Sequence, residues 1–153
     1  MKSKLRTLLQ HIATLWKVGF FPIAPGTAGT FVAFLFVILY RPGNRTLLII
    51  TLALLVVGTI AAHSAEKTLG KKDSGHIIID EVVGYFVSII YVESSMTVYV
   101  LAFFLFRAFD ILKPPPVNYV EKSLNGGLGV MMDDVAAGLY VNVALQIATS
   151  MKF

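Results

Sequence analysis

The sequence predicts an all-α protein, a small integral membrane helical bundle with short, partly re-entrant segments and an N-terminal amphipathic helix at the membrane interface. The chain has 153 residues, of which 56% are hydrophobic and 14% are charged, and it has no cysteine. A soluble domain carries charge on roughly a quarter of its residues. This composition excludes a disordered chain, a nucleic-acid-binding basic domain and a disulfide-stapled secreted module. We expect one membrane-embedded domain over residues 1–153.

Residues 1–18 are predicted to form the amphipathic helix. Their apolar positions, from Leu5 to Trp16, recur with helical spacing, and the basic residues fall outside that set. Polar residues interrupt the segment too often for the apolar run of a cleavable signal peptide. We expect this helix to lie on an anionic leaflet with Trp16 at the headgroup level, the alternative being a helix packed on the rest of the protein.

Five apolar stretches follow the first helix. A full crossing of a bilayer needs about 20 helical residues. The last stretch is long enough and the second is nearly so, whereas the others reach that length only with their polar flanks. Short segments with polar ends are tolerated where their backbone faces protein or water. The stretches cover residues 30–40, 46–62, 77–92, 97–112 and 128–149.

The distribution of basic residues predicts the orientation. If the N-terminus lies inside and each stretch crosses once, most of the 13 Lys and Arg residues fall on the inner side. The outer exceptions are Lys152 and the two arginines of the RPGNR turn, Arg41 and Arg45, which a re-entrant first hairpin would explain. In this orientation four polar motifs lie at the inner ends of segments, which predicts one site built from four pieces. The motifs cover residues 19–30, 71–84, 106–116 and 126–138.

Five acidic residues lie within or at the edges of the apolar stretches. An ionised carboxylate in hydrocarbon costs at least a few kcal/mol, so each needs a cationic or hydrogen-bonding partner. The only basic residue within these stretches is Arg107, one helical turn from the acid at position 110. One guanidinium does not neutralise five carboxylates, so we expect a divalent cation, and oxygen ligands favour Mg²⁺. The candidate catalytic residues are Asp80, Glu81, Asp110, Asp133 and Asp134, and all but Asp110 are predicted metal ligands.

Two acidic pairs share their sequence surroundings. The pair at 80–81 precedes VVG and the pair at 133–134 precedes VAAG. Both are expected near the N-terminal end of a helix, where the dipole favours negative charge. The glycines, Gly84 and Gly138, would allow close helix approach. Asp110 is expected instead near a helix C-terminus, where the helix dipole disfavours an anion. Because local electrostatics do not favour an acid at this position, we expect Asp110 to have a functional role.

Basic residues and a glycine-rich loop supply candidate contacts for a phosphate. Arg107 is suited to bidentate contact, and Lys113 and Lys122 to point-charge contact. The loop GFFPIAPGTAGT, which contains Thr27, can present backbone N–H groups to a phosphate at a helix N-terminus, although a simple turn into a helix explains it about as well. It is not a Walker A loop, because no GK[ST] follows.

Four motifs together resemble the phosphatidylglycerophosphatase A family: PIAPGTAGT, DSGHIIIDEVVG, FRAFDILKPPP and GGLGVMMDDVAAG. They occur in one order between residues 19 and 138, which makes the resemblance specific. It implies Mg²⁺-dependent hydrolysis of the terminal phosphomonoester of phosphatidylglycerophosphate, giving phosphatidylglycerol and phosphate. It also implies a multi-pass protein of the bacterial cytoplasmic (inner) membrane, with an active site that faces the cytoplasm and contains the five acids.

Two other functions are compatible with acids inside a membrane. A cation or proton carrier would distribute its acids across the bilayer, whereas here the outer halves of the segments lack them. A non-catalytic membrane scaffold would hold a structural cation at the same residues. For the phosphatase, water or an aspartate could attack phosphorus, and both remain open. The phospholipid substrate and membrane lipids are the expected partners, and the sequence makes no prediction of oligomeric state.

Overall fold

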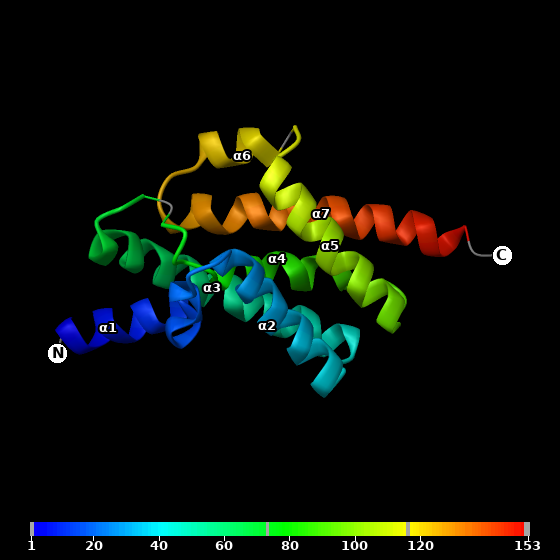
Figure 1. The fold of residues 1–153 in the computed structure, drawn as a ribbon, viewed down its shortest axis with the longest axis horizontal. Coiled ribbons are helices and arrows are strands. Elements are labelled where there is room, and N and C mark those ends of the chain that lie inside the picture. Colours follow the sequence, from blue (N-terminus) through cyan, green and yellow to red (C-terminus); the bar gives the residue numbers. More distant parts are fainter. Residues whose placement is uncertain (1, 73, 116, 152–153) are drawn as a thin grey trace.

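The structure, a computed structural model, describes residues 2–72, 74–115 and 117–151, except for the side chains of residues 2 and 120–122. All regular structure in these residues is helical, which confirms the predicted all-α fold (Figure 1). The elements are α1 (Lys2–Ala13), the 3₁₀ segment η1 (Leu15–Phe20), α2 (Pro25–Tyr40), α3 (Asn44–Leu69), α4 (Ile79–Ile89), α5 (Met96–Leu112), α6 (Val117–Ser123) and α7 (Gly127–Ser150).

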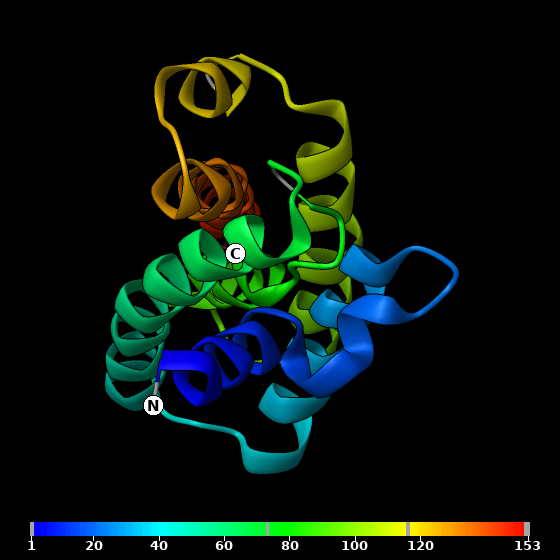
Figure 2. The ribbon, with the colours of Figure 1, turned by 90° about the vertical axis from the view of Figure 1, so that its left-hand side faces the viewer.

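Helix α4 is the centre of the bundle. It contacts α2, α3, α5 and α7, and its closest partner is α7 (Figure 2). Most of its residues are buried, including Tyr85 and Phe86. Figure 1 shows α2, α4 and α7 running in one direction along the long axis, with α3 and α5 running back. The alternating directions bring the four polar motifs toward the same end of the bundle.

Helix α3 presents an apolar face to the outside. Ile49, Leu52, Val56 and Ile60 recur at intervals of three and four residues, so they share one face, and each is more than half exposed. With 26 residues, α3 is one of two helices in the described chain that are long and apolar enough to cross a membrane, the other being α7 with 24. An outward apolar face of this size favours contact with lipid.

The other predicted segments are helices shorter than a full crossing. α2 has 16 residues, α5 has 17 and α4 has 11, compared with the roughly 20 that a span needs. The apolar stretch predicted over 77–92 is helical only between Ile79 and Ile89. Short α6 lies outside the five predicted stretches and contacts α7. That any of these segments is re-entrant stays a prediction.

The prediction of one amphipathic helix over residues 1–18 is wrong at its C-terminal end, because α1 ends at Ala13. The carbonyl oxygen of Ala13 accepts a hydrogen bond from the Ile78 N–H at 2.9 Å, whereas the Lys17 N–H, which would be its partner in a continuing helix, donates to the Thr14 carbonyl oxygen. Three residues with positive φ follow, and they turn the chain away: Leu15, Trp16 and Lys17. A tertiary contact therefore ends a helix that the local pattern would extend.

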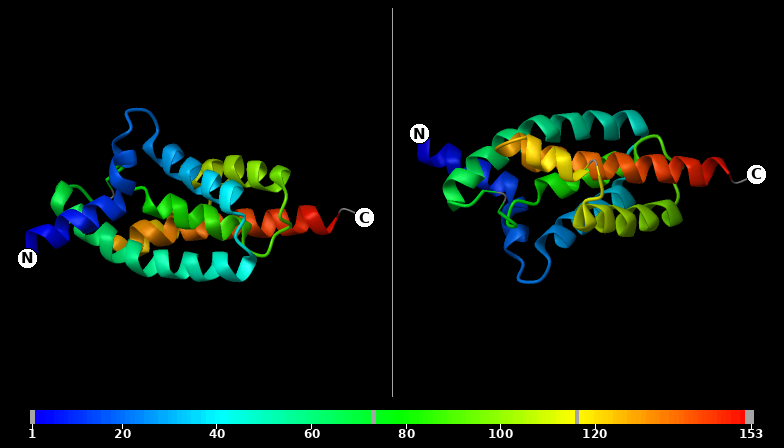
Figure 3. Two further views of the ribbon diagram at one scale, coloured as in Figure 1. Left: turned by 90° about the horizontal axis from the view of Figure 1, so that it is seen from below. Right: turned by 90° about the horizontal axis from the view of Figure 1, so that it is seen from above.

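Helix α1 packs on the C-terminal half of α3. Leu9, Ile12 and Ala13 lie against a group of alanines that includes Ala61 and Ala65. The alternative of a helix packed on the protein is therefore correct for this face. Beyond α1, the loop between η1 and α2 projects from the side of the bundle (Figure 3). The location of α1 on an anionic leaflet stays a prediction.

Candidate active site

Three carboxylates from two helices form a compact group. Asp80 and Glu81 lie in the first turn of α4, and Asp134 lies two turns into α7. One oxygen from each carboxylate lies within 4.8 Å of the others. Asp80 and Asp134 are buried, and Glu81 is nearly so. The structure thus brings together three of the four residues predicted to bind a metal.

Glycines allow the two helices to come this close. A Cβ added at Gly84 would lie 2.8 Å from the carbonyl oxygen of Asp134, and one added at Gly138 would collide with the backbone of Gly84. Further toward the C-terminal ends of α4 and α7, the Asn142 amide donates to the carbonyl oxygens of Val87 at 2.9 Å and Ile90 at 2.8 Å. Backbone contact and these hydrogen bonds hold α4 against α7, as the two glycines predicted.

Arg107 joins α5 to the carboxylate group. Its Nη1 donates to Asp110 Oδ2 at 2.6 Å and lies 3.8 Å from Glu81 Oε1. The predicted pairing of Arg107 with Asp110 is therefore confirmed. Asp110 lies near the C-terminal end of α5, where the dipole disfavours an anion, and the guanidinium offsets this.

The start of α2 lies against the same guanidinium. A Cβ added at Gly26 would be 3.0 Å from Arg107 Nη2 and would overlap the Glu81 carboxylate, so a side chain does not fit there. The glycine-rich motif predicted a site contribution, but its composition did not indicate this residue. Thr27 follows in the first turn of α2 and is half-buried. All four polar motifs thus contribute to one region of the molecule.

Asp133 has a different environment from Asp134. Its Oδ2 accepts a hydrogen bond from Lys113 Nζ at 2.8 Å, and its Oδ1 accepts from the Asp134 N–H at 3.0 Å. Asp133 therefore stands beside the group of three and not within it. Both Asp133 as a metal ligand and Lys113 as a phosphate contact stay predictions. The side chain of Lys122 lies outside the described residues.

Buried oxygens without partners mark the centre of the site. Asp80 Oδ1, Glu81 Oε2 and Asp134 Oδ2 are buried and accept no hydrogen bond within the described structure. In that same part of the chain, no basic side chain lies within 4.0 Å of the Asp80 or Asp134 carboxylate. Buried anions this close together are costly unless a cation neutralises them.

The residues present fit a divalent metal ion. They offer an all-oxygen set of three carboxylates, the ligands that Mg²⁺ and Ca²⁺ prefer. A guanidinium beside such a metal gives the combination that binds phosphate groups in proteins. The five acids are neither scattered over the described bundle nor each paired with a base of its own. Instead, Asp110 and Asp133 have close basic partners, and the other three share one region.

Comparison with known proteins gives consistent matches. A family model described as phosphatidylglycerophosphatase A matches residues 11–149. A Bacteroides thetaiotaomicron protein, provisionally named phosphatidylinositol-3-phosphatase, is 40% identical over 146 residues, which cover 90% of this chain and 91% of the relative. Phosphatidylglycerophosphatase A of Haemophilus influenzae is 35% identical over 147 residues, covering 94% and 90% of the two chains. Phosphatidylglycerophosphatase A of Escherichia coli is 32% identical over 124 residues, covering 79% and 72%. No solved structure matches this chain.

Proposed function

The chain belongs to the phosphatidylglycerophosphatase A family and is a phosphatase, and from this premise we propose a Mg²⁺-dependent reaction at the buried carboxylates. The substrate is phosphatidylglycerophosphate, whose terminal phosphomonoester is hydrolysed to phosphatidylglycerol and phosphate. One observation carries the proposal. Asp80, Glu81 and Asp134 place unpartnered buried oxygens together beside Arg107.

The three carboxylates would hold the Mg²⁺, which when bound supplies polarisation of phosphate oxygens and an activated water. Asp110 occupies one side of the Arg107 guanidinium and orients it, because the two side chains are hydrogen-bonded at 2.6 Å. The guanidinium's other N–H groups are then available for a phosphate, a contact that is often bidentate. Arg107 thereby reduces repulsion between a phosphate dianion and the carboxylates.

Lys113 adds a second positive charge near the site. Its side chain is a quarter exposed, and its ammonium is held by the buried Asp133 carboxylate. This placement lets Lys113 attract an anionic headgroup without neutralising the group of three carboxylates. Thr27, on the turn beside Arg107, and Lys122 are the other proposed phosphate contacts, and Asp133 is proposed as a further metal ligand.

We place the protein in the bacterial inner membrane as a multi-pass protein with its active site toward the cytoplasm. The apolar outer face of α3 and the inner location predicted for the basic residues support this orientation. Asp134 is the eighth residue of α7, about 10 Å along the helix from its start. A headgroup could reach that depth while its acyl chains stay in the bilayer.

The direct test measures phosphate release from phosphatidylglycerophosphate by detergent-purified protein, with Mg²⁺ or with EDTA. Asp80→Asn and Asp134→Asn should abolish release while the protein stays folded, because each removes a charged ligand. Glu93→Gln is the matched control, since Glu93 is an exposed acid in the loop between α4 and α5. A rate of phosphate release that is the same with EDTA as with Mg²⁺ would rule out the metal mechanism.

The same preparations separate the alternative functions. Full complementation of the cellular function by an amide variant that releases no phosphate would favour a scaffold with a structural cation, and ion flux in liposomes without phosphate release would favour a carrier. A carrier is disfavoured because the candidate acids gather at one end of the described bundle. Phosphatidylinositol-3-phosphate is the comparison substrate, given the name of one relative. We expect slower hydrolysis of this lipid, and the reverse order would change the substrate but not the metal site.

A further inference from the structure

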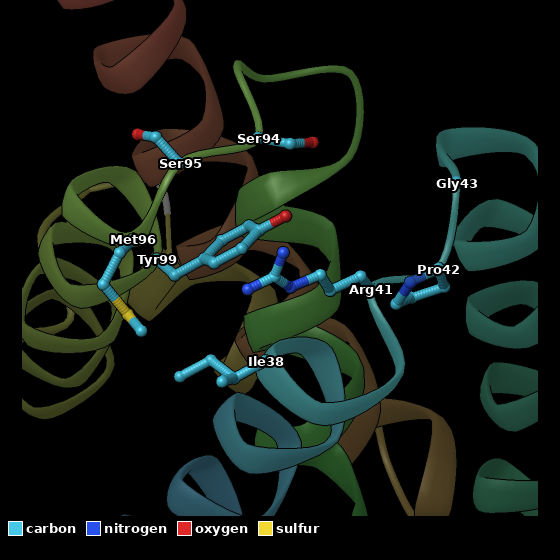
Figure 4. A pocket seen from close by; sticks show the side chains of 8 residues that line it. All are labelled: Ile38, Arg41, Pro42, Gly43, Ser94, Ser95, Met96 and Tyr99. Atoms are coloured by element: carbon cyan, nitrogen blue, oxygen red, sulfur yellow. The ribbon is translucent and has the colours of Figure 1, made fainter.

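A second polar site lies at the end of the bundle away from the carboxylates. A hollow of about 280 Å³ opens between the C-terminal end of α2, the turn into α3 and the start of α5 (Figure 4). Arg41, Ser94, Ser95 and Tyr99 contribute its polar lining. α2 has 16 residues, so the two ends of this helix are about 24 Å apart. One phosphate cannot occupy both places.

Arg41 is the charged residue of this hollow. Figure 4 shows its side chain extending across the hollow toward Tyr99, with Ser94 and Ser95 on the neighbouring loop. In the described part of the chain, no carboxylate lies within 4.0 Å of its guanidinium. Glu93 is next to Ser94 in sequence but does not line the hollow. The guanidinium can therefore accept an anion from outside the protein.

The backbone at Arg41 is an unusual place for a side chain. Arg41 caps α2 with φ 45°, in the left-handed region, while its N–H donates to the Val37 carbonyl oxygen at 2.9 Å. Glycine is the common residue at such a cap, because a Cβ is strained there. Here the cap position is occupied by Arg41, and the next glycine in the sequence comes two residues later, at Gly43. Strain of this kind is often found where a side chain has a binding role.

The opposite wall of the hollow is held in place by α4. The Tyr85 hydroxyl donates to the Tyr99 carbonyl oxygen at 3.0 Å, and the Ser95 hydroxyl oxygen accepts from the Val98 N–H at 3.3 Å. The first bond fixes the start of α5 relative to α4, and the second caps α5 at its N-terminus. Hydroxyl groups and a guanidinium around one hollow match the chemistry that binds phosphate oxygens.

We propose that this hollow binds the phosphodiester of an anionic phospholipid in the leaflet opposite the active site. Exposed apolar side chains lie next to the lining residues in the sequence of both helices. Leu39 and Tyr40 on α2 are each 73% exposed, and Met96 and Leu101 on α5 are about half exposed. Acyl chains can cover these surfaces once the phosphate is bound, whereas a free phosphate ion would leave them exposed. The site also explains a basic residue on the outer side, against the positive-inside tendency.

The test compares Arg41→Gly with Arg45→Gln in detergent-purified full-length protein. Arg41→Gly removes the guanidinium and suits the left-handed cap, so it should fold and keep wild-type phosphatase activity. Arg45→Gln removes one charge from the same turn at a residue that does not line the hollow. Native mass spectrometry measures bound phosphatidylglycerol, and hydrogen exchange measures protection of residues 94–99 when this lipid or inorganic phosphate is added.

Arg41→Gly should weaken phosphatidylglycerol binding at this site about tenfold, the effect of losing one charge-assisted contact. Arg45→Gln should bind like the wild type, and the lipid should protect residues 94–99 where inorganic phosphate does not. Equal loss in both variants would show general charge attraction and overturn the proposal. Unchanged binding in Arg41→Gly, or equal protection by inorganic phosphate, would also overturn it. Phosphatase activity reports separately on the carboxylate site.

Discussion

Adding one methyl group at Gly84 should separate the three carboxylates proposed to be catalytic. In Gly84→Ala the new Cβ would lie 2.5 Å from the Phe106 ring and 2.8 Å from the Asp134 carbonyl oxygen. Ordinary contact begins at 3.4 Å, so these neighbours must move by about 0.9 Å and 0.6 Å (3.4 minus 2.5 and 3.4 minus 2.8). Phe106 is fully buried, and the carbonyl belongs to the backbone of α7. Neither can swing aside, so α4 and α7 must move apart.

The separation should appear as a loss of turnover. A misplacement of about 1 Å can reduce catalysis about 100-fold, so we expect kcat to fall about 10- to 100-fold, or about 1.4–2.7 kcal/mol in the barrier. Alanine favours a helix by up to about 1 kcal/mol over glycine, so the loss would occur despite a gain in local stability. The assay follows phosphate release against Mg²⁺ concentration.

Gly43→Ala is the control for this change. A Cβ at Gly43 meets no atom within 4 Å, so its turnover and Mg²⁺ dependence should match the wild type. A folded Gly84→Ala protein with wild-type kcat and Mg²⁺ dependence would refute the reasoning. It would mean that close contact between α4 and α7 does not position the carboxylates.

Three further outcomes are expected. Mg²⁺ at about 100 times its dissociation constant should stabilise the wild type by about 2.7 kcal/mol, which would be measured as a higher melting temperature. Asp80→Asn should show no such shift in melting temperature. An equal shift in both proteins would mean that the ion binds elsewhere. Lys113→Gln should lower the free energy of unfolding by about 2 kcal/mol, because the buried Asp133 carboxylate loses a charged donor. Denaturation in mixed micelles measures this free energy. An unchanged value would show that the ion pair between Lys113 and Asp133 does not stabilise the fold. Asn142→Leu should cost about 2 kcal/mol in the same assay, since two carbonyl groups at the end of α4 lose their donor. A loss below about 0.5 kcal/mol would show that water replaces the amide.

Local patterns predicted the helices and the composition of the site. Continuous apolar stretches were sufficient to place α2, α3, α5 and α7, because burial of apolar surface acts on every turn of such a segment. The cost of a carboxylate in an apolar stretch singled out five acids before any contact was visible, and Asp80, Glu81 and Asp134 are three of them. Glycines four residues after two of them, Gly84 and Gly138, predicted the close approach of their helices.

Only the tertiary structure decided which groups meet. It paired Asp133 with Lys113, set Gly26 against Arg107, and ended α1 at Ala13 through a hydrogen bond from a residue far along the chain. None of these contacts leaves a periodic signal, because each joins segments that are distant in sequence. The sequence by itself therefore determined that acids lie within apolar stretches and which of them could supply ligands to a cation. The packing of α4 against α7 decided which three carboxylates lie close enough to share one.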